Sequence, residues 1–426
     1  MNVNNPVDIE SIKKRRVAYL ALFCLINFFT GAIYIWSVFA GPLAARIADA
    51  AGCVVKTSDL APVFGLATGV TPFVMLAGGF INDRFGPRLT IVFGGLAIAA
   101  GYALTTLAES VEMLYVSYGL CVGVGTGLVN GCTVNSSVKW FPDHRGFAGG
   151  LVTACLGIGA AVLPFVVRAL IGALGIAETL LAVGVISGVV IVISALQTTK
   201  CPDNLHAVLA PSTSRSGMRC APSMNWFEMV RTPLFYPLFL LFTSSAMMGL
   251  MLLSNISAIA QEQVGASAAL AALSVSVISI ANTSGRFVSG MLSDRIGRIQ
   301  TLILVLIVAL AGLIMLMSAG RGDTGLFFAG IVGVGICFGA FIGTYPSLVV
   351  DEYGPKHNSV NFSLMMLSYS VGGLAGPLVI RWANAGGDFS RAYMVCIAAA
   401  AAGIVCALVS LSLKRCALPA ADKASA

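Results

Sequence analysis

The stretch GFINDRFGPR at residues 79–88 is similar to the stretch GMLSDRIGR at residues 290–298, which lies 211 positions later in the chain. A second pair of stretches, residues 157–164 and 370–377, is related by a similar offset of 213 positions. Gly86 and Gly297 permit a tight turn inside each copy, because glycine tolerates backbone angles that other residues avoid. Two repeats with nearly the same offset predict that the chain consists of two similar halves arranged in parallel.

The composition indicates a membrane protein with many spans. Of the 426 residues, 58% are hydrophobic and only 10% are charged, whereas a soluble domain carries about 25% charged residues. The net charge of +7 does not indicate nucleic-acid binding, since no basic patch with interleaved aromatic residues is present. The sequence predicts no metal centre and no cofactor, because the 11 cysteines are scattered and form no Cys-x-x-Cys pair.

Twelve apolar segments are long enough to cross a bilayer as helices, so we expect an all-α membrane protein. These segments are 17–41, 60–81, 89–108, 111–138, 147–171, 176–196, 234–260, 268–292, 300–319, 324–350, 359–383 and 391–413. The expected organisation is an N-terminal segment, a six-helix bundle, a linker, a second six-helix bundle and a tail: 1–16, 17–196, 197–233, 234–413 and 414–426.

The positive charges predict the orientation of the spans. Placing both termini in the cytoplasm puts 18 of the 25 Lys and Arg residues on that side, which agrees with the excess of positive charge in cytoplasmic loops. We therefore expect a multi-pass protein with cytoplasmic termini, a cytoplasmic linker and the lipid bilayer as its surroundings.

Arg286 is the one charged residue that falls deep inside an expected span. It lies eight residues before Asp294, where charged residues resume, and this corresponds to a depth of about 12 Å. An arginine near the centre of a bilayer costs at least ~2.5–3.5 kcal/mol unless it faces water, a partner or a ligand. The 18 acidic residues fall in loops, termini or helix ends, so none is expected beside Arg286. This pattern predicts an anion-binding site.

The two copies of the G-x3-D-R-x-G motif resemble the signature loops of the major facilitator superfamily. The resemblance implies the twelve-helix fold of that family, with a cytoplasmic latch whose charges hold one conformation. The residues assigned to this gating role are Asp83 and Arg84, Asp294 and Arg295 in the second copy, and Arg145 in the segment KWFPDHRG at 139–146.

Four stretches give a finer resemblance to the oxalate/formate antiporter family and its monocarboxylate-transporting relatives. They are GAIYIWSVF at 31–39, KWFPDHRG at 139–146, IANTSGR at 280–286 with the DRIGR loop at 294–298, and YPS at 345–347. The resemblance implies that Arg286 binds the substrate carboxylate, and a planar guanidinium suits such a pairing. It also implies a bacterial inner membrane as the location.

Other residues are assigned to the substrate site with Arg286. Asn282 lies one helical turn before Arg286 and is expected to orient it. The family has a second cation where this chain has Tyr369, and a dianion would then keep one uncompensated charge at a cost of several kcal/mol. The remaining expected liners are Tyr34, Asn130 and Phe338, for each of which simple helix packing is the alternative.

The sequence therefore favours a monomeric secondary transporter of small organic anions that works by alternating access. A monocarboxylate such as pyruvate, lactate or formate is the preferred substrate, and exchange is the preferred mode. Two alternatives stay open within transport: an oxalate/formate antiporter and a proton-coupled monocarboxylate symporter. A carboxylate sensor would need a larger cytoplasmic domain. An enzyme is disfavoured, since no nucleophile–base pair or buried acid is recognisable.

Overall fold

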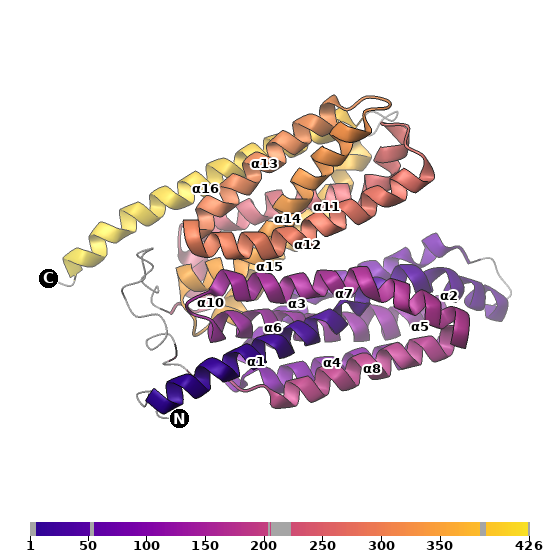
Figure 1. Ribbon diagram of the computed structural model, residues 1–426, viewed down its shortest axis with the longest axis horizontal. Helices are drawn as coiled ribbons and strands as arrows, with labels where there is room; N and C mark the ends of the chain where they lie inside the picture. Colours follow the sequence, from indigo (N-terminus) through magenta and orange to yellow (C-terminus); the bar gives the residue numbers. More distant parts are fainter. Residues whose placement is uncertain (1–5, 52–54, 203–204, 206–222, 384–388, 425–426) are drawn as a thin grey trace. The chain divides into compact units, whose positions relative to one another are not determined.

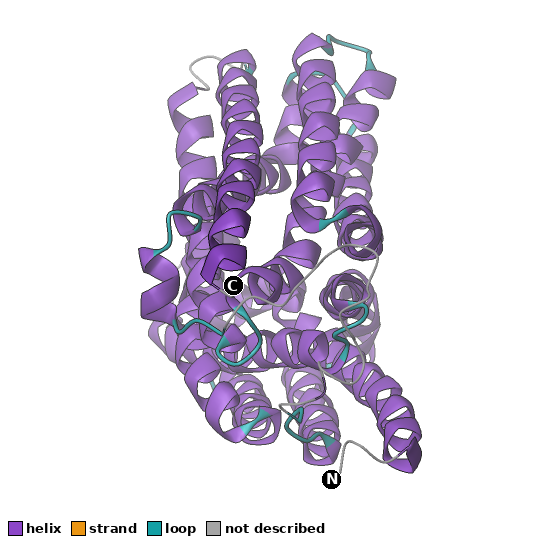
Figure 2. Cartoon of the chain, turned by 90° about the vertical axis from the view of Figure 1, so that its left-hand side faces the viewer, coloured by secondary structure: helices purple, strands orange, loops and turns teal. Residues whose placement is uncertain are grey.

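The structure is a computed structural model that describes residues 6–51, 55–202, 205, 223–383 and 389–424. Within these residues the chain is helical and forms no strand (Figure 2). Twelve of its helical segments are long and apolar enough to cross a membrane (Figure 1). The predicted all-α class with twelve spans is confirmed.

The first six spans contain helices α1 to α8 and two irregular segments. The first span joins α1 (Pro6–Thr30), the 3-10 segment η1 (Gly31–Ile35) and α2 (Trp36–Ala51). The fourth joins α5 (Val111–Leu114), the π-helical η3 (Tyr115–Val122) and α6 (Gly123–Trp140). The other four are α3 (Ala61–Phe85), α4 (Pro87–Thr105), α7 (Arg145–Leu174) and α8 (Ile176–Gln197).

The last six spans are formed by long helices without such joins. They are α11 (Phe235–Glu262), α12 (Ala268–Ile296), α13 (Arg298–Ser318), α14 (Thr324–Tyr353), α15 (Asn358–Ala383) and α16 (Ser390–Ala424). Several helices continue beyond the predicted bounds: α1 begins at Pro6 instead of residue 17, and α16 reaches Ala424 instead of 413. Hydropathy marks only the apolar part of a helix, whereas Lys, Arg and Glu extend a helix readily into a polar region.

The described part of the linker contains one helix that was not predicted, α10 (Trp226–Arg231). Its start is fixed by a capping box. The Asn225 side chain accepts hydrogen bonds from the backbone N–H groups of Phe227 and Glu228, and the Glu228 carboxylate accepts one from the N–H of Asn225. The rest of the predicted linker includes residues outside the described part.

The chain divides into two compact units. Unit 1 comprises residues 1–214 and 355–363, and unit 2 comprises residues 215–354 and 364–426. The short segment 355–363 therefore groups with unit 1, although it is distant from the rest of that unit in sequence. It includes the first six residues of α15, so this helix begins in unit 1 and continues in unit 2.

Candidate substrate-binding site

Arg286 lies on α12 in unit 2, and its guanidinium is oriented by a neighbour on the same helix. Its Nε donates to the Oδ1 atom of Asn282 at 3.1 Å, and one terminal nitrogen donates to the same atom at 2.8 Å. Asn282 is buried, with only 6% of its surface exposed, while Arg286 is half-buried. A buried amide that accepts two N–H groups restricts the rotation of the guanidinium and sets the direction of the fork.

Glycines on α14 fix the backbone that carries this pair. A Cβ added at Gly339 would overlap the carbonyl oxygen of Asn282, and one added at Gly343 would lie 2.8 Å from the Cα of Arg286. Gly285 on α12 likewise approaches the backbone of Ile336. Small residues that allow such close approach are the usual basis of tight helix packing in membranes. The two backbones are therefore in direct contact at the level of Arg286.

Two further predicted liners, Phe338 and Tyr369, stack on one another in the same unit. Their ring centroids are 6.0 Å apart and the rings are nearly parallel, at 14°. Phe338 is only 4% exposed, whereas Tyr369 is half-buried. The ring of Phe242 meets Tyr369 edge-on at 6.2 Å. Phe338 thus packs behind Tyr369, and of the two rings Tyr369 has the more accessible surface.

Tyr34 belongs to unit 1 and lies in the 3-10 segment η1, with 39% of its surface exposed. Two buried hydroxyls secure this segment: Tyr102 donates to the carbonyl of Ala32 at 2.8 Å, and Tyr118 donates to that of Ile33 at 2.7 Å. The change from α to 3-10 geometry releases carbonyl groups that must be satisfied inside a membrane. These bonds therefore hold the exposed Tyr34 on a rigid support.

Asn130 also belongs to unit 1, on α6, and is half-buried. Three residues further on, the Thr133 hydroxyl accepts a hydrogen bond from the amide of the buried Asn27 at 2.6 Å. The predicted substrate residues therefore fall into two sets. Arg286, Asn282, Phe338 and Tyr369 lie in unit 2, and Tyr34 and Asn130 lie in unit 1.

The first copy of the repeated loop anchors the beginning of α15. The Asp83 carboxylate accepts a hydrogen bond from Lys139 at 2.6 Å and further hydrogen bonds from the backbone N–H groups of Ser359 and Val360 at 3.3 and 3.2 Å. A carboxylate at the start of a helix also interacts favourably with the helix dipole. Neutral bonds accompany this contact: Asn82 donates to Ser359 at 2.8 Å, and Asn358 donates to Asn135 at 2.7 Å.

The charged residues of the second copy of the loop contact partners within unit 2. Arg298 donates to Asp294 at 2.6 Å, to the Ser293 hydroxyl at 2.7 Å and to Asp351 on α14 at 2.8 Å. The Arg298 side chain is only 5% exposed, so these charge-assisted bonds are shielded from water. Lys414 on α16 forms an ion pair with Glu352 beside this cluster.

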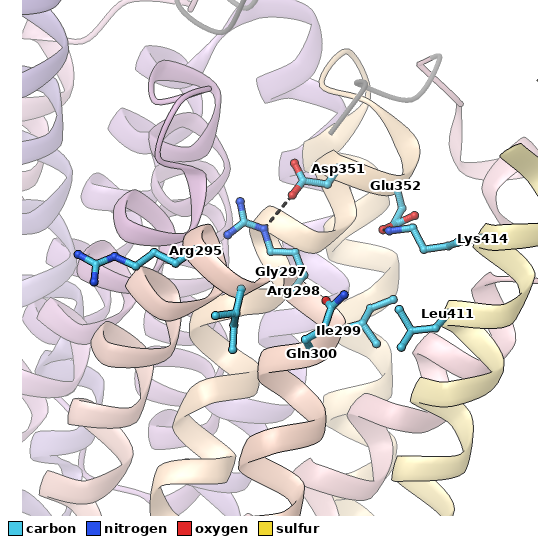
Figure 3. Close-up of a pocket in the computed structure, with 10 residues that line it drawn as sticks. Arg295, Gly297, Arg298, Ile299, Gln300, Asp351, Glu352, Leu411 and Lys414 are labelled. Carbon is cyan, nitrogen blue, oxygen red and sulfur yellow. Dashed lines mark hydrogen bonds and ion pairs between the residues drawn. The ribbon is translucent and has the colours of Figure 1, made fainter. Parts of the chain in front are cut away.

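A pocket of about 310 Å³ lies at this charged cluster (Figure 3). The dashed contact in the figure joins Arg298 to Asp351, while Arg295 points away from both acidic side chains. None of the residues predicted to bind substrate lines this pocket. Of the other predicted gating residues, Arg84 is exposed like Arg295, whereas Arg145, the first residue of α7, is buried.

Three kinds of residue were missing from the predicted site. The α14 glycines carry no polar side chain that would indicate a role in the site. The number of glycines in the sequence also does not indicate which of them touch a neighbouring backbone. Lys139, which pairs with Asp83, lies in the KWFPDHRG segment, but the sequence of that segment does not indicate which residue its ammonium group contacts. Arg298 offered the clearest signal, because it is the last residue of the second copy of the repeated loop, although its partner Asp351 lies 53 positions further along the chain.

The comparisons with known proteins agree with this architecture. The family model described as Major Facilitator Superfamily matches residues 28–377 and 249–416. The chain therefore belongs to the major facilitator superfamily, and it is a multi-pass membrane transporter rather than an enzyme.

Two relatives extend over most of the chain. The MFS-type transporter YhjX of Escherichia coli strain K12 is 29% identical over 84% of this chain and 87% of its own length. The oxalate:formate antiporter of Oxalobacter formigenes is 28% identical over 88% of this chain and 87% of its own length. Monocarboxylate transporter 9 of Rattus norvegicus is 32% identical over 33% of this chain and 28% of its own length.

Solved structures support the fold alone. The fucose:proton symporter of E. coli superimposes with a TM-score of 0.69 at 17% identity, covering 92% of this chain and 98% of the other. The human organic anion transporter MFSD10 gives a TM-score of 0.68 at 14% identity, covering 92% of this chain and 99% of the other.

Proposed function

We propose that this protein transports small organic anions, with a monocarboxylate such as pyruvate, lactate or formate as its substrate. The observation that carries the proposal is Arg286, a cation within an apolar spanning helix whose guanidinium is oriented by the buried Asn282. A carboxylate fits a guanidinium with two parallel hydrogen bonds, and this pairing is worth most where water is excluded. The similarity to an oxalate:formate antiporter and, over a third of the chain, to a monocarboxylate transporter supports the same class of substrate.

The number of cations argues for one carboxylate per substrate. Within the described spans no other Lys, Arg or His lies as far from a span end as Arg286, and Tyr369 carries a neutral hydroxyl that can act as a donor. A second carboxylate in this environment would keep a charge without a cation, which costs several kcal/mol. The proposed ligands in unit 2 are therefore Arg286 for the carboxylate and Tyr369 for a carboxylate or keto oxygen, supported by Asn282 and Phe338. For Tyr34 and Asn130 of unit 1, a role in substrate binding stays a prediction from the sequence.

The mechanism that we propose is alternating access with exchange. Binding of the anion neutralises Arg286, so the loaded carrier has a smaller electrostatic barrier to reorientation than the empty carrier. An empty carrier that reorients slowly transports mainly by exchanging one anion for another. In this proposal the charged loops around Asp83 and Asp294 stabilise one conformation of the carrier until substrate binding shifts the conformational equilibrium toward the other.

Thermal-shift measurements on the purified protein test the substrate class. We expect pyruvate, lactate or formate to raise the melting temperature of the wild type and oxalate to have a smaller effect, because only a ligand that binds the folded state stabilises it. The variant Tyr369→Lys restores a second cation and should gain stabilisation by oxalate. A wild type stabilised by oxalate more than by all monocarboxylates would contradict the monocarboxylate assignment in favour of the oxalate/formate alternative.

A second experiment tests for proton coupling by measuring uptake into liposomes that contain the protein, with and without a pH gradient across the membrane. Uptake that needs this gradient would contradict exchange.

A further inference from the structure

Two cysteines meet inside unit 1, on spans that are far apart in the sequence. Cys24 lies on α1 and Cys155 lies on α7, and their thiols are hydrogen-bonded to one another. Both side chains are half-buried, and both cysteines are free rather than joined in a disulfide. The proposed transport mechanism uses neither residue.

The backbones of α1 and α7 are in direct contact one helical turn further along. A Cβ added at Gly159 would overlap the carbonyl oxygen of Phe28. Gly159 is four residues after Cys155, and Phe28 is four residues after Cys24, so the thiol contact and the backbone contact have the same register. The two helices therefore lie against one another from the thiol pair onward.

This packing brings the two cysteines into the range that a disulfide needs. The Cα atoms of disulfide-linked cysteines are about 4.4–6.8 Å apart, which requires backbones that nearly touch. A further close approach follows at Gly31 of η1, where an added Cβ would lie 2.6 Å from the carbonyl oxygen of Leu156 on α7. Two successive backbone contacts leave little freedom for the helices to separate at the thiols, one turn of about 5.4 Å earlier.

The thiol pair lies within the apolar part of its two spans. Cys24 is eight residues after Arg16, and Cys155 is ten residues after Arg145, which corresponds to about 12 and 15 Å along the helices. An oxidant that reaches these thiols must therefore dissolve in the bilayer or cross it. Hydroperoxides, including those formed on lipid chains, meet this requirement.

We infer that Cys24 and Cys155 form a modification site, in which a hydroperoxide oxidises the pair to a disulfide that links α1 to α7. The hydroperoxide transfers one oxygen to the first sulfur and gives a sulfenic acid, while its O–O bond breaks and an alcohol leaves. The second thiol then attacks the sulfenic sulfur, so that the S–S bond forms, the S–O bond breaks and the oxygen leaves as water with the thiol proton. The two sulfurs together lose two electrons, and the hydroperoxide gains them. The reaction is independent of the transported substrate.

The neighbouring thiol protects the pair from irreversible oxidation. A sulfenic acid without a thiol beside it is oxidised further to a sulfinic acid, whereas condensation stops at a disulfide that a thiol reductant can reverse. Cys121 and Cys406 are also half-buried and lie in spans, but neither is hydrogen-bonded to another sulfur within the described part of the chain. These two cysteines are therefore internal controls.

The test treats the full-length protein in proteoliposomes with tert-butyl hydroperoxide and then blocks the remaining thiols with N-ethylmaleimide. Mass spectrometry of the unreduced peptides should find a linked pair that contains Cys24 and Cys155. Its yield should be at least about five times that of any linkage through Cys121 or Cys406, because only the first pair has its second thiol in place. This cross-link is read in the wild type, so the test does not depend on the folding of a variant.

A variant then tests the protective role of the second thiol. Cys24→Ser removes this thiol and keeps a side chain of similar size, so Cys155 should reach the sulfinic acid at least about five times more often than in the wild type. Cys121→Ser is the matched control and should leave both the linked pair and the Cys155 sulfinic acid at wild-type levels. The inference is wrong if both thiols of the treated wild type stay reduced, or if the cross-link joins two copies of the chain. Equal formation of the Cys155 sulfinic acid with and without Cys24 would also overturn it.

Discussion

The two halves of this transporter have related sequences but different polar groups at related positions. The residue 211 positions before Arg286 is Met75, which is buried. In unit 2 the equivalent position therefore carries a cation oriented by Asn282, and in unit 1 it carries an apolar side chain. The duplicated loops differ as well: Asp83 binds the first turn of α15, whereas Asp294 binds Arg298 of its own unit. The comparison teaches that the two halves keep a similar loop sequence while the polar groups at related positions, and the partners of those groups, differ.

The largest expected effect comes from removing the cation from the half that has one. Arg286→Gln loses a pair of charge-assisted hydrogen bonds worth about 3 kcal/mol, which corresponds to roughly a 100-fold fall in kcat/KM for monocarboxylate uptake. The measurement is uptake of radiolabelled pyruvate into proteoliposomes. Met75→Leu, at the related position of the other half, is the matched control and should keep at least half of the wild-type activity. A similar loss in both variants would remove the functional contrast between the halves.

The second prediction concerns the close helix contact beneath the cation. Gly343→Ala places a methyl group against the Arg286 backbone, and such overpacking costs about 1–3 kcal/mol, so we expect a melting temperature lower by roughly 5 °C. In unit 1, Gly41 has nothing within 4 Å of an added Cβ, and Gly41→Ala should melt within about 1 °C of the wild type. Equal melting temperatures for the two variants would show that the α12–α14 contact is looser than described.

The third prediction compares the duplicated loops. Asp83→Asn removes an ion pair with Lys139 and a charge at the start of α15, together worth about 1–2 kcal/mol, so uptake should slow by roughly 5- to 30-fold. Asp294→Asn leaves Arg298 its bond to Asp351, and we expect less than about a 3-fold change. The measurement is the rate of pyruvate uptake by the two variants and the wild type in proteoliposomes. A larger defect in Asp294→Asn would reverse the roles assigned to the two loops.

The fourth prediction concerns Asn282, the residue that orients the cation, and its truncation should have a much smaller effect than loss of the cation itself. Asn282→Ala removes the acceptor for two N–H groups of Arg286 but keeps the cation, so the carboxylate can still bind. A loss of about 1 kcal/mol predicts roughly a 5-fold rise in KM with little change in kcat. Asn282→Asp, in contrast, places an acid against Arg286 and should block uptake by competing with the substrate carboxylate. Full activity in Asn282→Asp would exclude a role for the Arg286 charge in substrate binding.

Much of the fold was predictable, because the length of an apolar stretch is a property of a single segment. The twelve spans and the helical class depended only on such local patterns. Arg286 was recognisable from its depth alone, and the spacing of four residues indicated Asn282 as its neighbour. The ends of α1 and α16 were not predictable from hydropathy, because charged residues continue a helix without marking where it stops.

Contacts between segments that are distant in the chain could not be predicted from the sequence. Many glycines lie in the spans, and nothing in their spacing indicated that Gly339 and Gly343 touch α12 or that Gly159 touches α1. The pairing of Arg298 with Asp351 joins residues 53 positions apart, and the grouping of residues 355–363 with unit 1 joins segments still more distant. Such contacts depend on how helices pack, and packing is decided by the whole set of surfaces rather than by one segment.

The central claim, that a substrate carboxylate binds Arg286, is tested most directly by an experimental structure of the transporter with pyruvate bound. We expect both carboxylate oxygens to lie about 2.7–2.9 Å from guanidinium nitrogens of Arg286, while Asn282 still accepts from the same side chain. A pyruvate bound elsewhere, or bound without a contact to Arg286, would contradict the account.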